Sequence, residues 1–213
     1  MFISFEGTEG VGKTTLINSL NQYLLQKGLS TILTREPGGT PLAEQIRSLL
    51  LMQHEEKVNE DCELLLLFAA RAQHIHQVIQ PALQQNKWVL SDRFVDASFA
   101  YQGGGRQLSQ HKITLLQQQF VALMPQLTFW LDAPVEVGMQ RAQKRAALDR
   151  FEQEKLAFFE RVRAVYMERA QAEPLRIFRI DAMQTPEQML NQVIKLLEKQ
   201  GGLDVLHHTG FNL

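Results

Sequence analysis

The sequence predicts an α/β fold in which a parallel sheet carries helices on both faces. Short apolar runs, each the length of a buried strand, alternate along the chain with longer stretches in which apolar residues recur at three- and four-residue steps. This alternation favours strands joined by helical crossovers, and therefore a parallel sheet. A length of 213 residues with 45% hydrophobic content fits one compact domain over residues 1–213.

The expected elements follow in order from the N-terminus. The run Met-Phe-Ile-Ser-Phe predicts a first strand over residues 1–5, and further short apolar runs predict strands over 31–34, 88–91, 127–131 and 177–180. Helical periodicity predicts helices over 13–27, 42–51, 63–83, 109–123, 135–145, 152–171 and 185–199. Residues 201–213 begin with a Gly-Gly pair and lose the periodicity, so we expect a loose tail there.

Charge balance and cysteine content exclude several classes of protein. Twenty-two Lys and Arg against 23 Asp and Glu leave a formal charge of -1, so the chain lacks the basic field that nonspecific nucleic-acid binding requires. The single cysteine, Cys62, excludes an intramolecular disulfide framework and a zinc site built from cysteines, and it is typical of a cytoplasmic protein. No apolar stretch reaches the length of a membrane span, so we expect no membrane partner.

A glycine-rich segment lies between the first expected strand and the first expected helix. It reads Gly7, Thr8, Glu9, Gly10, Val11, Gly12, Lys13, Thr14 and matches the phosphate-loop pattern G-x-x-x-x-G-K-[ST]. The glycines let backbone N–H groups turn toward phosphates at the positive end of the following helix. Lys13 is expected to reach the β- and γ-phosphates, and Thr14 to supply a hydroxyl to Mg²⁺. The loop predicts binding of a nucleoside triphosphate but does not by itself identify a reaction.

Two expected strands end in a carboxylate, which is where a phosphate-loop enzyme places the acid that holds Mg²⁺. These acids are Asp92 and Asp132. We favour Asp92 because the adjacent Arg93 offers a guanidinium for a second phosphate, and a phosphotransferase must fix both donor and acceptor. Capping of the next helix is the alternative role for either acid.

Two further segments allow either a functional or a structural interpretation. Residues 34–40, Thr-Arg-Glu-Pro-Gly-Gly-Thr, lie at the carboxyl edge of the expected sheet, where ligands bind, but they also have the composition of a plain turn. Phe68 and Arg71 lie three positions apart on an expected helix, so a ring and a guanidinium could together hold a planar base. Taken alone, Phe68 is more typical of a core residue.

A basic cluster lies around the end of an expected helix, within about residues 141–152, and residues 146–149 predict a bend there. It contains Arg141, Lys144, Arg145 and Arg150. Such a run is usually a solvated helix face. In a phosphate-transfer protein the same run could form a short lid that closes over ATP and neutralises charge in the transition state.

Several segments, read in order, resemble bacterial thymidylate kinases. They are FEGTEGVGKTT, TREPGGTPLAEQIRSLLL, LLLFAAR, SDRF, AYQGGGR and LDRFEQEKLAFFERVRAVY, and they run from the first strand to about Tyr166. The resemblance implies a P-loop NTPase fold with a five-stranded parallel sheet, a homodimer, and transfer of the ATP γ-phosphate to dTMP with Mg²⁺. It assigns residues 7–14 to ATP.

The resemblance also implies an acceptor site. Arg93 and Arg35 would bind the dTMP phosphate, Phe68 would stack on thymine, and Arg71 would donate to the base. The remaining positions that fall where the family lines its nucleoside pocket are Ser98, Tyr101 and Gln102, with Glu36, Pro37 and Tyr166 as weaker candidates.

Glu9 stands inside a loop that binds phosphate, which a carboxylate would repel unless it points elsewhere. The resemblance implies that this acid faces the deoxyribose 3′-hydroxyl and that the catalytic arginines come from the lid, here Arg141, Arg145 and Arg150. Gln143, Ala146 and Ala147 depart from the more basic or glycine-containing lids of relatives.

Two rival functions remain open from the sequence. The phosphate loop alone also fits another nucleoside monophosphate kinase on the same scaffold. A nucleotide-gated binding module of the GTPase type would need an N-K-x-D stretch, and the segment Asn86-Lys87-Trp88-Val89 lacks the aspartate.

Overall fold

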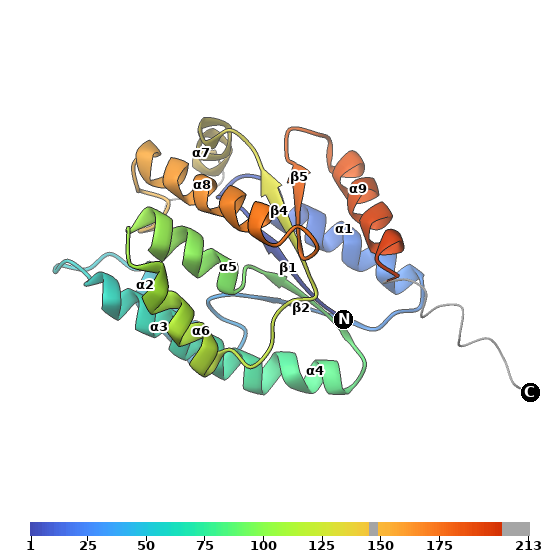
Figure 1. Cartoon of the computed structure of the whole chain (residues 1–213), viewed down its shortest axis with the longest axis horizontal. Helices are drawn as coiled ribbons and strands as arrows, with labels where there is room; N and C mark the ends of the chain where they lie inside the picture. Colours follow the sequence, from blue (N-terminus) through green and yellow to red (C-terminus); the bar gives the residue numbers. More distant parts are fainter. Residues whose placement is uncertain (145–148, 202–213) are drawn as a thin grey trace, which may run out of the picture.

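A five-stranded parallel sheet forms the centre of the computed structural model, which describes residues 1–144 and 149–201 (Figure 1). The strand order is β2-β3-β1-β4-β5. The strands are β1 (Phe2–Glu6), β2 (Thr31–Arg35), β3 (Trp88–Asp92), β4 (Leu127–Asp132) and β5 (Ile177–Asp181). The predicted α/β fold is therefore confirmed, and each strand lies within one residue of its expected bounds.

Helices connect the strands and cover the sheet. The α-helices are α1 (Lys13–Gln26), α2 (Pro41–Leu51), α3 (Glu60–His74), α4 (Gln80–Gln84), α5 (Val95–Ser98), α6 (Gln110–Phe120), α7 (Val135–Gln143), α8 (Leu156–Ala172) and α9 (Pro186–Lys199). Two π-helical turns, η1 (Ile75–Ile79) and η2 (Phe99–Gly105), continue α3 and α5. In the part of the chain just described, no helix is long and apolar enough to cross a membrane.

Side chains on the two faces of the sheet enter two separate apolar clusters. Ile3 and Phe5 of β1 pack with leucines of α1 and with Val193 of α9, so these two helices cover one face. Phe2 points the other way and packs with Phe94 and with residues of α3 and α8. Side chains along β1 thus point alternately to the two faces of the sheet and pack into a buried apolar layer on each face, as is typical of a parallel sheet.

The structure differs from the expected helices at several ends. The stretch expected as one helix over residues 63–83 begins at Glu60 and contains the π-helical turn η1. The helix expected over 152–171 begins at Leu156, and the one expected over 109–123 ends at Phe120. The helical stretch from Val95 to Gly105 was not expected, because its three consecutive glycines are unfavourable in a helix. The expected tail from residue 202 onward lies outside the described residues.

Candidate active site

The phosphate loop follows β1, the central strand, and runs into α1. Gly10 and Gly12 have positive φ values of 74° and 97°, a backbone region that favours glycine. A Cβ on Gly10 would also lie 2.1 Å from the carbonyl oxygen of Gly138 in α7, so the loop packs tightly beneath that helix. The first turn of α1 contains no acidic residue, and Thr14 is exposed there. The positive helix end is therefore open to an anion.

Lys13 lies inside this loop with only 8% of its surface exposed. Its Nζ donates to the carbonyl oxygens of Thr8 at 2.8 Å and Gly7 at 3.1 Å. Burial lowers the pKa of Lys13 to about 8, and the nearby charge of Arg93 acts in the same direction. The charges of Asp92, Glu9 and Glu6 act in the opposite direction, and a bound polyphosphate would favour the ammonium form further.

Arg93 connects the phosphate loop to the helical stretch that follows β3. Its guanidinium donates to the Gly7 carbonyl at 2.9 Å, to Glu9 Oε1 at 2.7 Å and to the Tyr101 hydroxyl at 3.0 Å. The Tyr101 hydroxyl in turn donates to Glu9, which holds this carboxylate beside Arg93. Arg93 has a φ of 70°, a strained backbone conformation for a non-glycine residue that concentrates at functional sites.

Two adjoining cavities open at this edge of the sheet. The phosphate cavity is lined by Lys13, Thr14, Asp92 and Arg35, among others. The acceptor cavity encloses about 630 Å³, including space open to solvent, and its lining includes residues of α3, α5 and η2. Arg93 lines both cavities and lies where they meet. A single guanidinium can therefore contact groups in either cavity.

The acceptor cavity brings together most of the residues expected to bind a nucleoside. Ser98, Tyr101, Gln102, Pro37 and Arg71 all line it. They come from α5, η2, the loop after β2, and α3, which lie far apart in the sequence. Among described residues the Arg71 guanidinium is held by Ser98 Oγ at 3.1 Å and by Glu36 Oε2 at 2.6 Å.

Phe68 and Tyr166 do not lie where the sequence analysis expected. Phe68 is 3% exposed and does not line the acceptor cavity, because the Arg71 guanidinium lies over its ring at 4.8 Å. Leu67 lines the cavity in its place. Tyr166 is also buried, and its hydroxyl donates to Glu6 Oε2 at 2.7 Å. It therefore supports the site from behind and does not line either cavity.

The two strand-end acids have different surroundings. Asp92 lines the phosphate cavity with Thr14. Asp132 is buried, and its carboxylate accepts from Arg163 at 2.6 and 3.1 Å and from Arg179 at 2.8 Å. The Asp132 carboxylate is held in ion pairs with two guanidinium groups and therefore has a structural role. Asp92 and Thr14 carry side-chain oxygen atoms of the kind that Mg²⁺ prefers as ligands.

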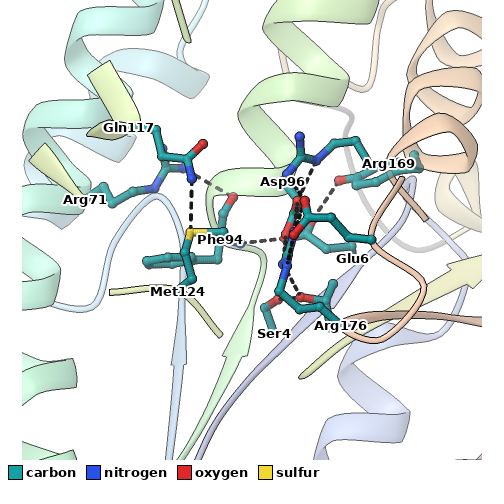
Figure 2. Close-up of polar contacts among 12 residues, drawn as sticks. Ser4, Glu6, Arg71, Phe94, Asp96, Gln117, Met124, Arg169 and Arg176 are labelled. Atoms are coloured by element: carbon teal, nitrogen blue, oxygen red, sulfur yellow. Dashed lines mark hydrogen bonds and ion pairs between the residues drawn. The ribbon is translucent and has the colours of Figure 1, made fainter. Parts of the chain in front are cut away.

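A second layer of buried charge lies behind the site. Figure 2 shows Phe94 joining two parts of it, since its N–H donates to Glu6 at 2.8 Å and its carbonyl accepts from Arg71 at 3.3 Å. Burial raises the pKa of Glu6 to about 8, with a smaller contribution from the charge of Asp96. Burial acts on Asp96 in the same sense, but Arg176 and Arg169 outweigh it and keep the pKa of Asp96 below its usual value.

Two of the expected lid arginines, Arg141 and Arg150, belong to the described part of the chain, and they do not gather over the phosphate loop. Arg150 donates to Glu63 Oε2 at 2.6 Å and to the Leu50 carbonyl at 2.9 Å, which fixes it against α3 and the end of α2. Arg141 is exposed and donates to the Ala182 carbonyl at 3.2 Å. Neither residue lines the phosphate cavity. Arg145 lies outside the described residues.

One cationic residue of the site was missed from the sequence. Arg47 of α2 lines both cavities and donates to the Pro37 carbonyl at 2.9 Å. The position of Arg47 in the sequence indicated that it faces inward, because positions 43, 47 and 50 share one helix face. Both Ala43 and Leu50 on that face are buried. Arg47 therefore lies on the inward stripe of α2 and not on a solvated face.

Comparisons with known proteins show which family this chain resembles. A family profile described as Thymidylate kinase matches residues 5–193. A thymidylate kinase from Acinetobacter baumannii (strain SDF) is 63% identical over 198 residues, covering 92% of this chain and 100% of that protein. One from Acinetobacter baylyi is 59% identical, covering 93% and 98%. The crystal structure of thymidylate kinase from Ehrlichia chaffeensis matches with a TM-score of 0.77 at 32% identity, covering 92% of this chain and 98% of that one. The chain belongs to the thymidylate kinase family.

Proposed function

We propose that the two cavities hold ATP and dTMP and that the protein transfers the γ-phosphate of ATP to dTMP, giving ADP and dTDP. Family membership supports the activity, and the shared position of Arg93 supports the assignment of the cavities. A phosphotransferase must hold two phosphates in line, and a guanidinium at the junction of two cavities is suited to that task.

The donor occupies the phosphate cavity in this proposal. Backbone N–H groups of residues 7–14 and the positive end of α1 bind the phosphates of ATP. Lys13, which now donates to two loop carbonyls, transfers its hydrogen bonds to phosphate oxygens. Thr14 and Asp92 hold Mg²⁺, which offsets the negative charge of the triphosphate.

The acceptor occupies the other cavity. Its phosphate lies where the two cavities meet, between Arg93, which lines both, and Arg35, which lines the phosphate cavity. Arg71 with Ser98 donates to the thymine ring. Glu9, held by Tyr101, accepts from the sugar 3′-hydroxyl. Leu67 provides the apolar contact to the base that the sequence analysis assigned to Phe68.

Phosphoryl transfer then requires positioning and charge neutralisation more than covalent help from the protein. The attacking oxygen of dTMP is already anionic, so no general base is needed. Lys13 and Arg93 both line the phosphate cavity and balance the negative charge that develops on the transferring group. A lid arginine, Arg141 or Arg145, would help to neutralise this negative charge. Arg150 would first have to leave Glu63.

The proposal is tested by ADP release in the presence of ATP and Mg²⁺ with dTMP, dUMP, dCMP, dGMP, AMP or no acceptor. We expect a preference for dTMP. Preference for another monophosphate would keep the donor site but contradict the acceptor assignment, and release that is independent of acceptor would contradict phosphoryl transfer.

We further propose that the protein is a cytoplasmic homodimer. Exposed apolar side chains occur on three helices, with Leu49 on α2, Leu65 on α3, and Leu115 and Phe120 on α6. Because α3 packs against both α2 and α6, these side chains belong to neighbouring elements. A solution mass near twice the 24.4 kDa of one chain is expected, and a monomer at all concentrations would contradict the proposal.

A further inference from the structure

A buried histidine lies behind the acceptor cavity. His74, the last residue of α3, is 0% exposed. Its Nδ1 lies 3.1 Å from Glu36 Oε1, and its Nε2 lies 2.6 Å from the Thr34 hydroxyl. A buried ring with both nitrogens in hydrogen bonds is a fixed element of the structure.

Glu36 links His74 to Arg71, which lines the acceptor cavity. While Oε1 faces His74, Oε2 accepts from Arg71 Nε at 2.6 Å, and both side chains of this ion pair are 3% exposed. Arg71 uses its remaining nitrogens on Ser98 and on the Phe94 carbonyl, the latter visible in Figure 2. The direction in which the Arg71 guanidinium points is thus set by a carboxylate that His74 holds.

The backbone around His74 leaves the ring little freedom. Arg71 and His74 lie three positions apart on α3, so they share one helix face. On the opposite side, a Cβ added to Gly39 would lie 2.5 Å from His74 Cδ2. The ring is therefore held between α3, the end of β2 and the loop that carries Glu36.

We propose that His74 is a positioning residue for recognition of the acceptor base. In this arrangement a proton on Nδ1 is donated to Glu36, while Nε2 shares a hydrogen bond with the Thr34 hydroxyl. His74 thereby fixes the Glu36 carboxylate, which orients Arg71 toward the base. The inference rests on the proposed function, because it requires Arg71 to contact dTMP.

Substitutions at His74 separate this role from simple filling of space. Asn carries an amide N–H close to the position of Nδ1 and can still donate to Glu36, whereas Gln places its amide near Nε2 and Leu offers no donor. We expect His74→Leu and His74→Gln to raise the KM for dTMP about tenfold, the effect of losing a hydrogen bond to a buried charged group, with the KM for ATP and kcat within about twofold. His74→Asn is expected to restore the KM for dTMP to within about twofold of the original protein.

Two controls make the experiment decisive. His76→Leu changes an exposed histidine two residues away and is expected to leave both KM values unchanged. Arg71→Ala reports on the contact that His74 is proposed to serve. An equal rise in KM for Asn, Gln and Leu would show that the ring only fills space and would overturn the inference. So would a rise in the KM for dTMP with Arg71→Ala but not with His74→Leu or His74→Gln. An unchanged KM for dTMP in Arg71→Ala would instead contradict the acceptor-cavity assignment, on which the inference depends.

Discussion

Asp92 and Asp132 end β3 and β4, the two parallel strands that flank β1, and their surroundings predict opposite consequences of the same substitution. Asp92→Asn removes a charge that lines the phosphate cavity, so we expect kcat to fall by about 10²-fold or more with little change in stability. Asp132→Asn removes a buried carboxylate charge that pairs with Arg163 and Arg179. It should therefore destabilise the fold while turnover at low temperature is retained.

The size of the second effect can be worked from the contacts. Losing one partner of a buried ion pair costs about 3–5 kcal/mol. The Asp132 side chain is 1% exposed, but Arg163 and Arg179 are 32% and 58% exposed, and water can solvate them once the carboxylate is lost. We therefore expect a loss of about 2 kcal/mol in the free energy of unfolding and a fall in Tm of about 4–8 °C.

The assay pairs ADP release, measured against Mg²⁺ concentration, with thermal unfolding of the same preparations. Asp181→Asn is a matched control, because Asp181 also ends a strand but lines neither cavity and is exposed. It should leave kcat unchanged. The reasoning is refuted if Asp132→Asn abolishes turnover at unchanged Tm while Asp92→Asn remains active.

Three further predictions concern Lys13, Glu6 and Arg93. Because burial holds the pKa of Lys13 at about 8 and only the ammonium form binds phosphate, kcat/KM for ATP should fall as pH rises through about 8; a flat profile to pH 10 would contradict this. Glu6 has a folded pKa of about 8 against 4.5 when unfolded, so the folded state holds an extra proton between these values and its stability should fall as pH rises across that window. Glu6→Gln should remove that fall in denaturant titrations, and an unchanged slope would show that Glu6 is ionised in the fold. Arg93→Ala should raise the KM for dTMP by about 10²-fold or more, since a charge-assisted contact to phosphate is lost, and a variant altered only in the KM for ATP would place Arg93 on the donor.

The inner part of the sheet could be predicted from the sequence because β1, β3 and β4 are buried on both faces. Each of these strands is a short, mainly apolar segment, and the glycine pattern after β1 marks the phosphate loop. The helical stretch from Val95 to Gly105 could not be predicted in this way. Its glycines lower helix propensity, and packing against α8 stabilises it instead, with Gly104 placed so that a Cβ would lie 2.8 Å from the Arg161 carbonyl.

The acceptor site was predicted only in part, because its details depend on side-chain direction. The sequence placed Phe68 and Arg71 on one helix face, but it could not show that the guanidinium covers the ring and leaves Leu67 toward the cavity. It favoured Asp92 over Asp132 only through the adjacent Arg93, since the arginines that bind Asp132 lie 31 and 47 positions away in the chain. The direction of a side chain and the partner of a carboxylate depend here on contacts between segments that are distant in the sequence.

The most direct test of the central claim follows the phosphoryl group itself. ATP labelled in its γ-phosphate is incubated with the protein, Mg²⁺ and dTMP, and the labelled products are separated. We expect the label to appear in dTDP, in step with ADP formation. Label released as inorganic phosphate at the same rate with and without dTMP would contradict it.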